Sequence, residues 1–326
     1  MDERDMIAQF DQVIDAVLAG QPVSSGADAA LVRVAEALRA LPSDEFRKRL
    51  GEQLANAASS MKGENSMTAQ PAPQGYNSLM PYLIVNGASE FIDFLKTAFG
   101  AQERMRVPTP DGKIMHAEVM IEDSVIELAD AGENYPARPG ILHMYVPDVD
   151  ATYRKAIDAG ATSTYAIVDQ DYGDREGSVK DRFGNTWYIA TSKSPETVRG
   201  YLPQGLRALT VYLHPTGTPA YIDFLKAAFG AQQELRFEDP DGRVAHARLR
   251  IGDSAVEMGE AHGVYQPVPM GLHLLVPDVD AVYRRAVEAG GKAISEPEDK
   301  PYGYRSAEIG DSIGNLWFIA SPLTKS

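Results

Sequence analysis

A long internal repeat constrains this chain more than any other feature. The stretch 142–160 reads LHMYVPDVDATYRKAIDAG, and the stretch 272–290 reads LHLLVPDVDAVYRRAVEAG. Residues 79–190 align with residues 209–320 without a gap, and about 50 of about 112 aligned positions are identical. The chain therefore contains a duplication, and whatever it binds has two related places in which to bind.

Each copy predicts the same order of strands and helices. Short apolar stretches predict strands, and stretches with apolar residues at helical spacing predict helices. In the first copy we expect two βαβββ modules: strand 80–85, helix 89–99 and strands 103–107, 113–121 and 124–129, then strand 141–146, helix 149–159 and strands 162–168, 177–181 and 186–191. Asp148 and Asp278 precede the second helix of each copy, where a carboxylate can accept hydrogen bonds from the first turn.

The N-terminal part differs from the repeats. Residues 1–60 carry apolar stripes at helical spacing, which predict a small all-α module of three amphipathic helices. Residues 61–78 lack periodicity and are rich in Gly, Pro, Ser and Asn, which predicts a flexible linker. Two roles for the module remain open: a packing or dimerisation appendage, and a specific docking module.

Composition excludes several functional classes. The formal net charge of −15 repels phosphate backbones, so we expect no nucleic-acid partner. The absence of cysteine excludes disulfides and thiolate chemistry. The N-terminal residues lack the features of a signal peptide, and no apolar run has the length of a membrane span. We therefore expect a cytoplasmic protein with no membrane partner.

Four motifs in this order resemble those of a known family. They are FLKTAFGA after the first strand, PDG at a hairpin, VPDVDA at the start of the second module and DRFGNTW near the end. The pattern resembles the vicinal oxygen chelate superfamily, in its glyoxalase/bleomycin-resistance-like branch and most closely the PhnB-like group. The resemblance implies an α+β fold with two tandem domains, 79–192 and 206–322. In each domain, paired βαβββ modules would form a cup-shaped sheet that holds the ligand.

The resemblance also implies positions for a metal ion, and this chain departs from them. Metal-dependent members place four ligands on the first and last strands of the two modules. These positions fall on Met80, Glu127, Ile141 and Tyr188 in the first copy, and on Thr210, Glu257, Gly271 and Phe318 in the second. Only the glutamate is a ligand type in either copy, and one ligand does not hold a divalent ion. The sequence therefore predicts no bound metal and no cofactor, and it leaves the catalytic residues unknown, with Glu127 and Glu257 as candidate general bases.

Strand alternation selects the residues that would line the cups. Side chains two apart share one face of a strand, so His116 and Glu118 should lie opposite the apolar Ala117 and Val119. The predicted ligand-contacting residues on the strands are Tyr82, His116, Glu118, Glu127, His143, Tyr145, Tyr188, Tyr212, His214, His246, Glu257, His273 and Phe318. Three roles remain open for His116, His143, His246 and His273: core residues bonded to backbone carbonyls, ligand contacts, and metal ligands.

A loop before the seventh strand of each copy supplies further candidates. They are Tyr172 with Arg175 in the first copy and Tyr302 with Arg305 in the second. The tyrosine could stack on a ring and the arginine could hold an anionic group. Alternatively, each arginine pairs with Asp181 or Asp311 and is structural.

We therefore expect a metal-independent protein that binds or sequesters a small molecule, aromatic or partly anionic, and that could form a homo-oligomer. The first alternative is a lyase, isomerase or dioxygenase that holds a divalent transition metal with relocated ligands, for which the second copy is the better candidate. The relocated ligands would be His214, His246, Glu257 and His273. The second alternative is a regulatory adaptor in which ligand binding alters docking by residues 1–60.

Overall fold

The computed structural model describes residues 73 and 75–323, all of which belong to one compact unit, 69–326. The predicted helices in 1–60 and most of the predicted linker 61–78 lie outside the described residues. The end of that linker belongs to the fold. The backbone N–H of Ser78, for example, donates to Asp253 Oδ1 at 2.7 Å, and Ser78 is buried.

The two copies contain the predicted elements in the predicted order. The first copy comprises β1 (Leu79–Val85), α4 (Ala88–Phe99), β2 (Gln102–Pro108), β3 (Ile114–Ile121), β4 (Ser124–Asp130), β5 (Ile141–Tyr145), α5 (Val149–Asp158), β6 (Thr162–Asp169), β7 (Asp174–Lys180) and β8 (Thr186–Ser192). The second comprises β11 (Leu209–Leu213), α6 (Thr218–Phe229), β12 (Gln232–Glu238), β13 (Val244–Ile251), β14 (Ser254–Met258), β15 (Gly271–Leu275), α7 (Val279–Glu288), β16 (Lys292–Lys300), β17 (Tyr304–Gly310) and β18 (Leu316–Pro322). A short hairpin of β9 (Thr197–Val198) and β10 (Leu202–Pro203) lies in the connection between the copies.

Local sequence signals explain the helix ends. Asp148 caps α5 by accepting a hydrogen bond from the backbone N–H of Ala151, and Asp278 caps α7 in the same way. Gly100 ends α4 with φ of 68°, a left-handed conformation that glycine adopts without strain. The predicted caps are therefore confirmed.

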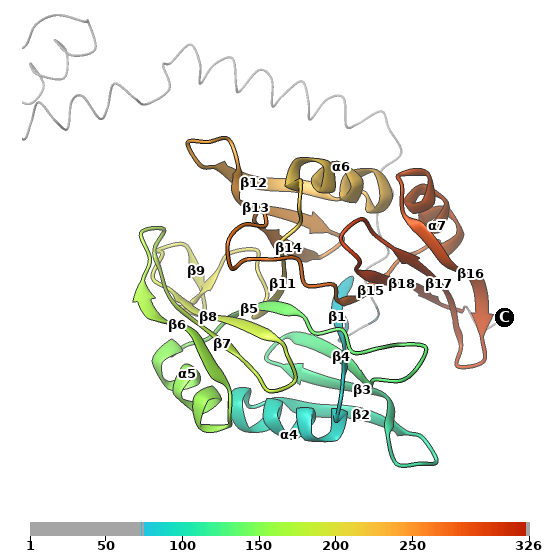
Figure 1. The fold of residues 1–326 in the computed structure, drawn as a ribbon, viewed down its shortest axis with the longest axis horizontal. Coiled ribbons are helices and arrows are strands. Elements are labelled where there is room, and N and C mark those ends of the chain that lie inside the picture. The colour runs from blue at the N-terminus through green and yellow to red at the C-terminus, as the bar shows by residue number, and fades with distance from the viewer. Residues whose placement is uncertain (1–72, 74, 324–326) are drawn as a thin grey trace, which may run out of the picture. The chain divides into compact units, whose positions relative to one another are not determined.

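Each cup-forming sheet combines strands from both copies. One eight-stranded sheet has the order β16-β17-β18-β15-β1-β4-β3-β2, and the other has the order β12-β13-β14-β11-β5-β8-β7-β6. Figure 1 shows β1 between β4 of its own copy and β15 of the other copy. The antiparallel junctions pair Met80 with His273 in the first sheet and Thr210 with His143 in the second. The α+β class and the paired modules are confirmed, but the modules that share a sheet come from different copies.

The exchange follows from the edge strands of the modules. In each module the first strand along the chain lies at one edge of the module's four strands. The unpaired backbone groups of that edge strand require a partner strand. The two copies present nearly the same edge, so the sequence does not distinguish pairing within a copy from pairing between copies. Because of the exchange, each cup requires residues of both copies.

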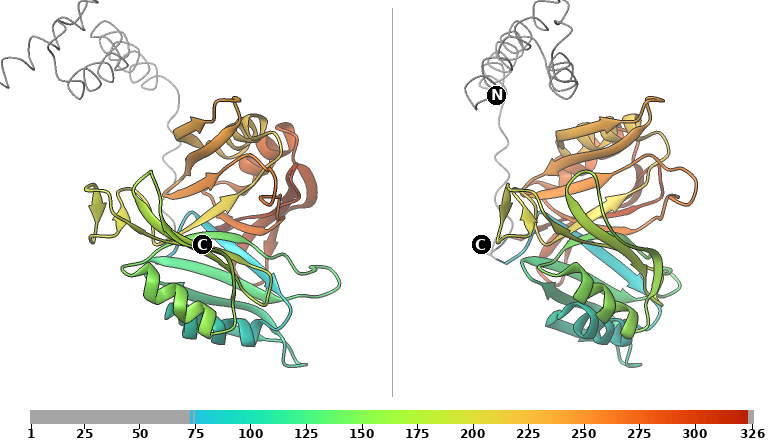
Figure 2. Two further views of the ribbon diagram at one scale, coloured as in Figure 1. Left: turned by 60° about the vertical axis from the view of Figure 1, so that its left-hand side comes forward. Right: turned by 90° about the vertical axis from the view of Figure 1, so that its left-hand side faces the viewer.

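The helices of each copy lie together and cover the outer faces of the sheets. In Figure 2, α4 and α5 lie side by side against the strands of the first copy, and they contact one another. The largest buried side chain beneath them is Trp187, whose ring lies 4.6 Å from that of Phe99 and whose Nε1 donates to Asp181 Oδ2. Trp317, Phe229 and Asp311 repeat this arrangement in the second copy. The helix-covered faces are thus packed, and the opposite faces are left for a site.

Candidate functional site

The third strand shows how the sequence assigns side chains to the two faces of the sheet. Ala117 and Val119 are fully buried in the hydrophobic core beneath the helices. His116 and Glu118 lie on the opposite face, where Glu118 is the cross-strand partner of Glu127. The alternation that the sequence predicts for this strand is confirmed.

The first of the two cups lies on the sheet that contains β1 and β15. We define it by the side chains on the face away from the helices: Tyr82, His116, Glu118, Glu127, His273, Phe318 and, on a loop, Tyr302. The rings of Tyr82 and Phe318 lie 4.9 Å apart, across the junction between the copies. This cup thus combines a strip of aromatic rings with two imidazoles and two carboxylates.

Both carboxylates of the first cup have hydrogen-bond donors. His273 Nδ1 lies 2.7 Å from Glu127 Oε2, and the Tyr76 hydroxyl donates to Glu118 at 3.0 Å. Burial lowers the pKa of His273, but the charge of Glu127 outweighs burial and raises this pKa above the usual value. Burial likewise raises the pKa of Glu118, but the nearby imidazole of His116 and the hydrogen bond from Tyr76 outweigh it and lower the pKa. Glu118 is therefore ionised at neutral pH.

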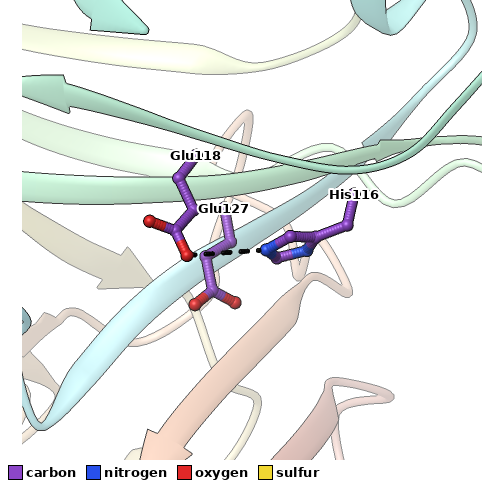
Figure 3. A group of neighbouring side chains, drawn as sticks. All are labelled: His116, Glu118 and Glu127. Carbon is purple, nitrogen blue, oxygen red and sulfur yellow. Dashed lines mark ion pairs between the residues drawn. The ribbon is translucent and has the colours of Figure 1, made fainter. Parts of the chain in front are cut away.

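One group of side chains in the first cup has the composition of a metal site. One ligand atom from each of His116, Glu118 and Glu127 lies within 4.8 Å of the others. Figure 3 shows the imidazole and the two carboxylates turned toward a common space. An imidazole with two carboxylates suits several divalent transition ions. The family's positions predict no metal in this cup, and the convergence of these three residues was not predicted from the sequence.

The second cup lies on the sheet that contains β5 and β11. We define it by His143, Tyr145, Tyr165, Tyr172, Asp174, Glu176, Tyr188, Tyr212, His214, His246 and Glu257. Five of these residues are tyrosines, and the rings of Tyr188 and Tyr212 lie 5.2 Å apart, edge to face. Tyr165, Asp174 and Glu176 were not among the predicted site residues.

A buried imidazolium lies between two carboxylates in the second cup. His143 Nδ1 is 2.7 Å from Glu257 Oε2, and His143 Nε2 is 3.3 Å from Glu176 Oε2. Burial alone lowers the pKa of His143, but the two glutamates outweigh it and raise this pKa well above that of a free imidazole. His143 is therefore charged at neutral pH. With Asp174 as a third carboxylate, the second cup carries net negative charge.

The other imidazoles of the second cup are neutral. Burial lowers the pKa of His214 to about 4, and Tyr188 and the carbonyl of Gly259 contact its two nitrogens. Burial also lowers the pKa of His246, whose Nδ1 lies 3.3 Å from the Tyr212 hydroxyl. None of the hydrogen bonds of His116, His143, His246 and His273, for which three roles were left open, goes to a backbone carbonyl in the described part of the chain.

Exposed tyrosines border both cups. Tyr302 is 70% exposed and Tyr135 is 42% exposed beside the first cup, and Tyr172 and Tyr265 are their counterparts beside the second. The Tyr265 ring lies 5.2 Å from that of His214, and the Tyr172 hydroxyl lies 3.5 Å from Glu176. Tyr135 and Tyr265 were not among the predicted site residues. They occupy equivalent positions in the two copies, and this repetition could have identified them as candidates.

The two loop arginines do not point into the cups. Strand β7 begins at Asp174, before the predicted start, so Asp174 and Glu176 face the cup and Arg175 faces the helices. Arg175 makes a bidentate contact with Asp150, with both distances below 2.9 Å, and Arg305 repeats it with Asp280. The prediction that these arginines contact the ligand is wrong. The structural alternative holds, but with helix N-terminal aspartates rather than Asp181 and Asp311.

The exchange between copies redistributes the family's metal positions and leaves them unsuited to a metal. The first cup has Met80, Glu127, Gly271 and Phe318 at these positions, and the second has Thr210, Glu257, Ile141 and Tyr188. Gly271 admits no side chain, because a Cβ there would lie 2.4 Å from the backbone oxygen of Tyr82. The relocated set of the alternative hypothesis is also wrong, because His273 lies on one sheet while His214, His246 and Glu257 lie on the other.

The family assignment agrees with this architecture. The profile of the Glyoxalase/Bleomycin resistance protein/Dioxygenase superfamily matches residues 75–189 and 216–319. The chain belongs to this superfamily. Its members share the fold, and the matches do not decide between catalysis and binding. Among the described helices, none is both long and apolar enough to cross a membrane.

Similar proteins are known in bacteria and plants. An uncharacterised protein of Mycobacterium bovis is 41% identical over 123 residues, which cover 34% of this chain and 81% of that protein. The structure of glyoxalase I from Zea mays matches with a TM-score of 0.58 at 16% identity, covering 75% of this chain and 92% of that one. A putative dioxygenase from Bacillus subtilis matches with a TM-score of 0.50 at 12% identity, covering 74% and 84%. At these identities the structural matches support the fold alone.

Proposed function

We propose that this superfamily member is a cytoplasmic protein that binds or sequesters small molecules, of the bleomycin-resistance type and within the PhnB-like group. Its two cups are not equivalent. The proposal rests on one observation: at the family's metal positions each cup keeps only a glutamate, and a histidine of the other copy is bonded to that glutamate. In the second cup, binding therefore relies on aromatic surface and charge, without a metal.

The chemistry of the second cup favours a flat aromatic ligand that carries a positive charge. Tyrosine rings attract cations through their faces, and three carboxylates outnumber the one imidazolium. The charge of Arg248, which aligns with Glu118, is balanced by Glu234, with Nε and Oε2 2.9 Å apart. The expectation of an anionic ligand depended on the loop arginines. It is no longer supported, because Arg175 and Arg305 form ion pairs with aspartates on the helix side.

A fluorescence titration of metal-free protein tests this proposal. The probes are proflavine and anthracene-9-carboxylate, which share three fused rings but carry opposite charge at neutral pH. We expect proflavine to bind about tenfold more tightly, because a desolvated cation–π contact contributes up to about 2 kcal/mol. Changing Tyr172 and Tyr265 together to alanine should weaken proflavine binding by about tenfold. Arg175→Ala, which alters the helix side of the same strand, should leave it unchanged.

Two outcomes contradict the proposal. One is equal or tighter binding of the anionic probe, which would place the ligand-determining charge elsewhere. The other is proflavine binding that needs an added divalent ion, which would make the metal-dependent alternative the better hypothesis. Mass spectrometry of small molecules that remain bound after purification would then identify the natural ligand class.

A further inference from the structure

The first cup contains three potential metal donors, of which only Glu127 belongs to the family's set. His116 and Glu118 lie on β3 and Glu127 lies on β4, whereas the family's set in this cup would need Met80, Gly271 and Phe318. We propose that His116, Glu118 and Glu127 together bind one divalent transition-metal ion in the first cup. The second cup should bind none in this way. This inference needs no knowledge of the organic ligand and stands independently of the proposed function.

The distances allow such a site with small side-chain movements. His116 Nε2 and Glu118 Oε1 lie 3.7 Å apart, close to the roughly 3.4 Å between two ligands of a tetrahedral ion at about 2.1 Å. The three ligand atoms all lie within 4.8 Å of one another, and donors on opposite sides of an ion lie about 4.2 Å apart. A rotation of one carboxylate closes this difference.

A neighbour contacts one ring nitrogen of His116, whereas in each glutamate a single neighbour contacts both carboxylate oxygens. The Tyr82 hydroxyl lies 3.2 Å from His116 Nδ1, which leaves Nε2 to face the carboxylates. Tyr76 holds the carboxylate of Glu118 at 3.0 Å, and His273 holds that of Glu127 at 2.7 Å. A carboxylate has about four lone-pair sites, so both glutamates keep oxygen lone pairs for an ion. Outer partners of this kind orient the ligands of protein metal sites and fix their tautomers.

The second cup provides a natural comparison within the chain. Four residues of the first group have counterparts in the second cup with similar contacts. His116, Tyr82, Glu127 and His273 correspond to His246, Tyr212, Glu257 and His143, respectively. The exception is Arg248, which stands where the first cup has Glu118. An arginine side chain is protonated at neutral pH and has no lone pair with which to bind an ion. The second cup thus lacks one of the three donors that the first cup provides.

The burial of the two glutamates adds an electrostatic reason. Glu118 is 5% exposed and Glu127 is 2% exposed, and they are neighbours across adjacent strands. Like charges at such positions destabilise a sheet unless a cation lies nearby. Arg104 approaches Glu118 only to 3.9 Å, while His273 lies against Glu127 alone. A divalent ion between the carboxylates would satisfy both charges at once.

The test uses full-length protein without an affinity tag, stripped with chelator and dialysed against micromolar Zn²⁺ in excess Mg²⁺. Elemental analysis should give one zinc per chain. Co²⁺ substitution should give visible absorption bands that report ligation. We expect His116→Gln and Glu118→Gln each to lower zinc affinity by about 100-fold or more, and Tyr82→Phe to lower it by about tenfold. The matched control His246→Gln changes the equivalent imidazole of the second cup and should leave stoichiometry and affinity unchanged.

Circular dichroism checks that each variant folds. If a variant that lacks a ligand does not fold, Tyr82→Phe still tests the site, because it removes only the hydroxyl that contacts His116. The proposal is wrong if stripped wild-type protein takes up no zinc. It is also wrong if His246→Gln lowers zinc binding as much as His116→Gln. Because no organic probe is present, failure here does not affect the proflavine prediction, and failure of proflavine binding does not affect this one.

Discussion

Removing the carboxylate of Glu257 should destabilise the fold by about 3 kcal/mol. Glu257 is 2% exposed, and its partner His143 is charged and almost fully buried. Removing one partner of such a buried pair costs about 3–5 kcal/mol, because the remaining charge is left without compensation. We expect the lower end for Glu257→Gln, since Glu176 still lies 3.3 Å from the other ring nitrogen of His143. The corresponding change His143→Asn should cost more, because it leaves two carboxylates without their shared cation.

Urea denaturation at pH 7, followed by far-ultraviolet circular dichroism, measures these changes for both single variants and the double variant. The double variant should be more stable than the sum of the single effects predicts, by at least about 1 kcal/mol, as is typical of contacting charges. Independent effects, which add within about 0.5 kcal/mol, would refute the ion pair as described. A cost below about 1 kcal/mol for Glu257→Gln would refute it as well.

Three further predictions follow from other contacts. The folded pKa of His143 lies above that of a free imidazole, so its stabilisation is complete below about pH 6.5 and is lost as pH rises through the raised value. The cost of His143→Asn in urea denaturation should therefore be larger at pH 6 than at pH 10, and an equal cost would contradict this. Gly271→Ala places a Cβ 2.4 Å from a backbone oxygen and should cost at least about 1–3 kcal/mol in thermal unfolding, whereas Gly132→Ala, with no atom within 4 Å, should be close to neutral. Arg248→Glu gives the second cup the same donor types as the first, so a second, weaker zinc equivalent should appear in elemental analysis, and unchanged stoichiometry would contradict the assigned role of this position.

Much of the fold could be predicted because local patterns and tertiary structure agree. The alternation in β3 assigned Ala117 to the helices and His116 to the cup, and Asp148 marked the start of a helix. The pairing of modules could not be predicted in the same way. The two copies have almost the same edge strand. The backbone groups of an edge strand can pair with the edge strand of either copy, so the sequence does not show which copy supplies the partner.

The site was less predictable for a similar reason. The early start of β7 places Arg175 inside a strand instead of in a loop, so that Glu176 faces the cup and Arg175 faces the helices. The pairing of Asp150 with Arg175 recurs in the second copy, where Asp280 and Arg305 occupy the equivalent positions. The two residues of each pair are far apart along the chain, so the sequence alone does not reveal that they are in contact. The convergence of Glu118 with Glu127 required the register of β3 on β4, which sequence spacing alone does not fix.

The exchange of strands between copies has a consequence for how such a protein can diversify. A single-copy relative that used the same exchange would need two chains, and its two sites would change together with every mutation. In a fused chain, a substitution enters one site and leaves its twin untouched, as Arg248 and Glu118 illustrate. Fusion thereby allows two sites that would otherwise be identical to change independently within a single folded unit.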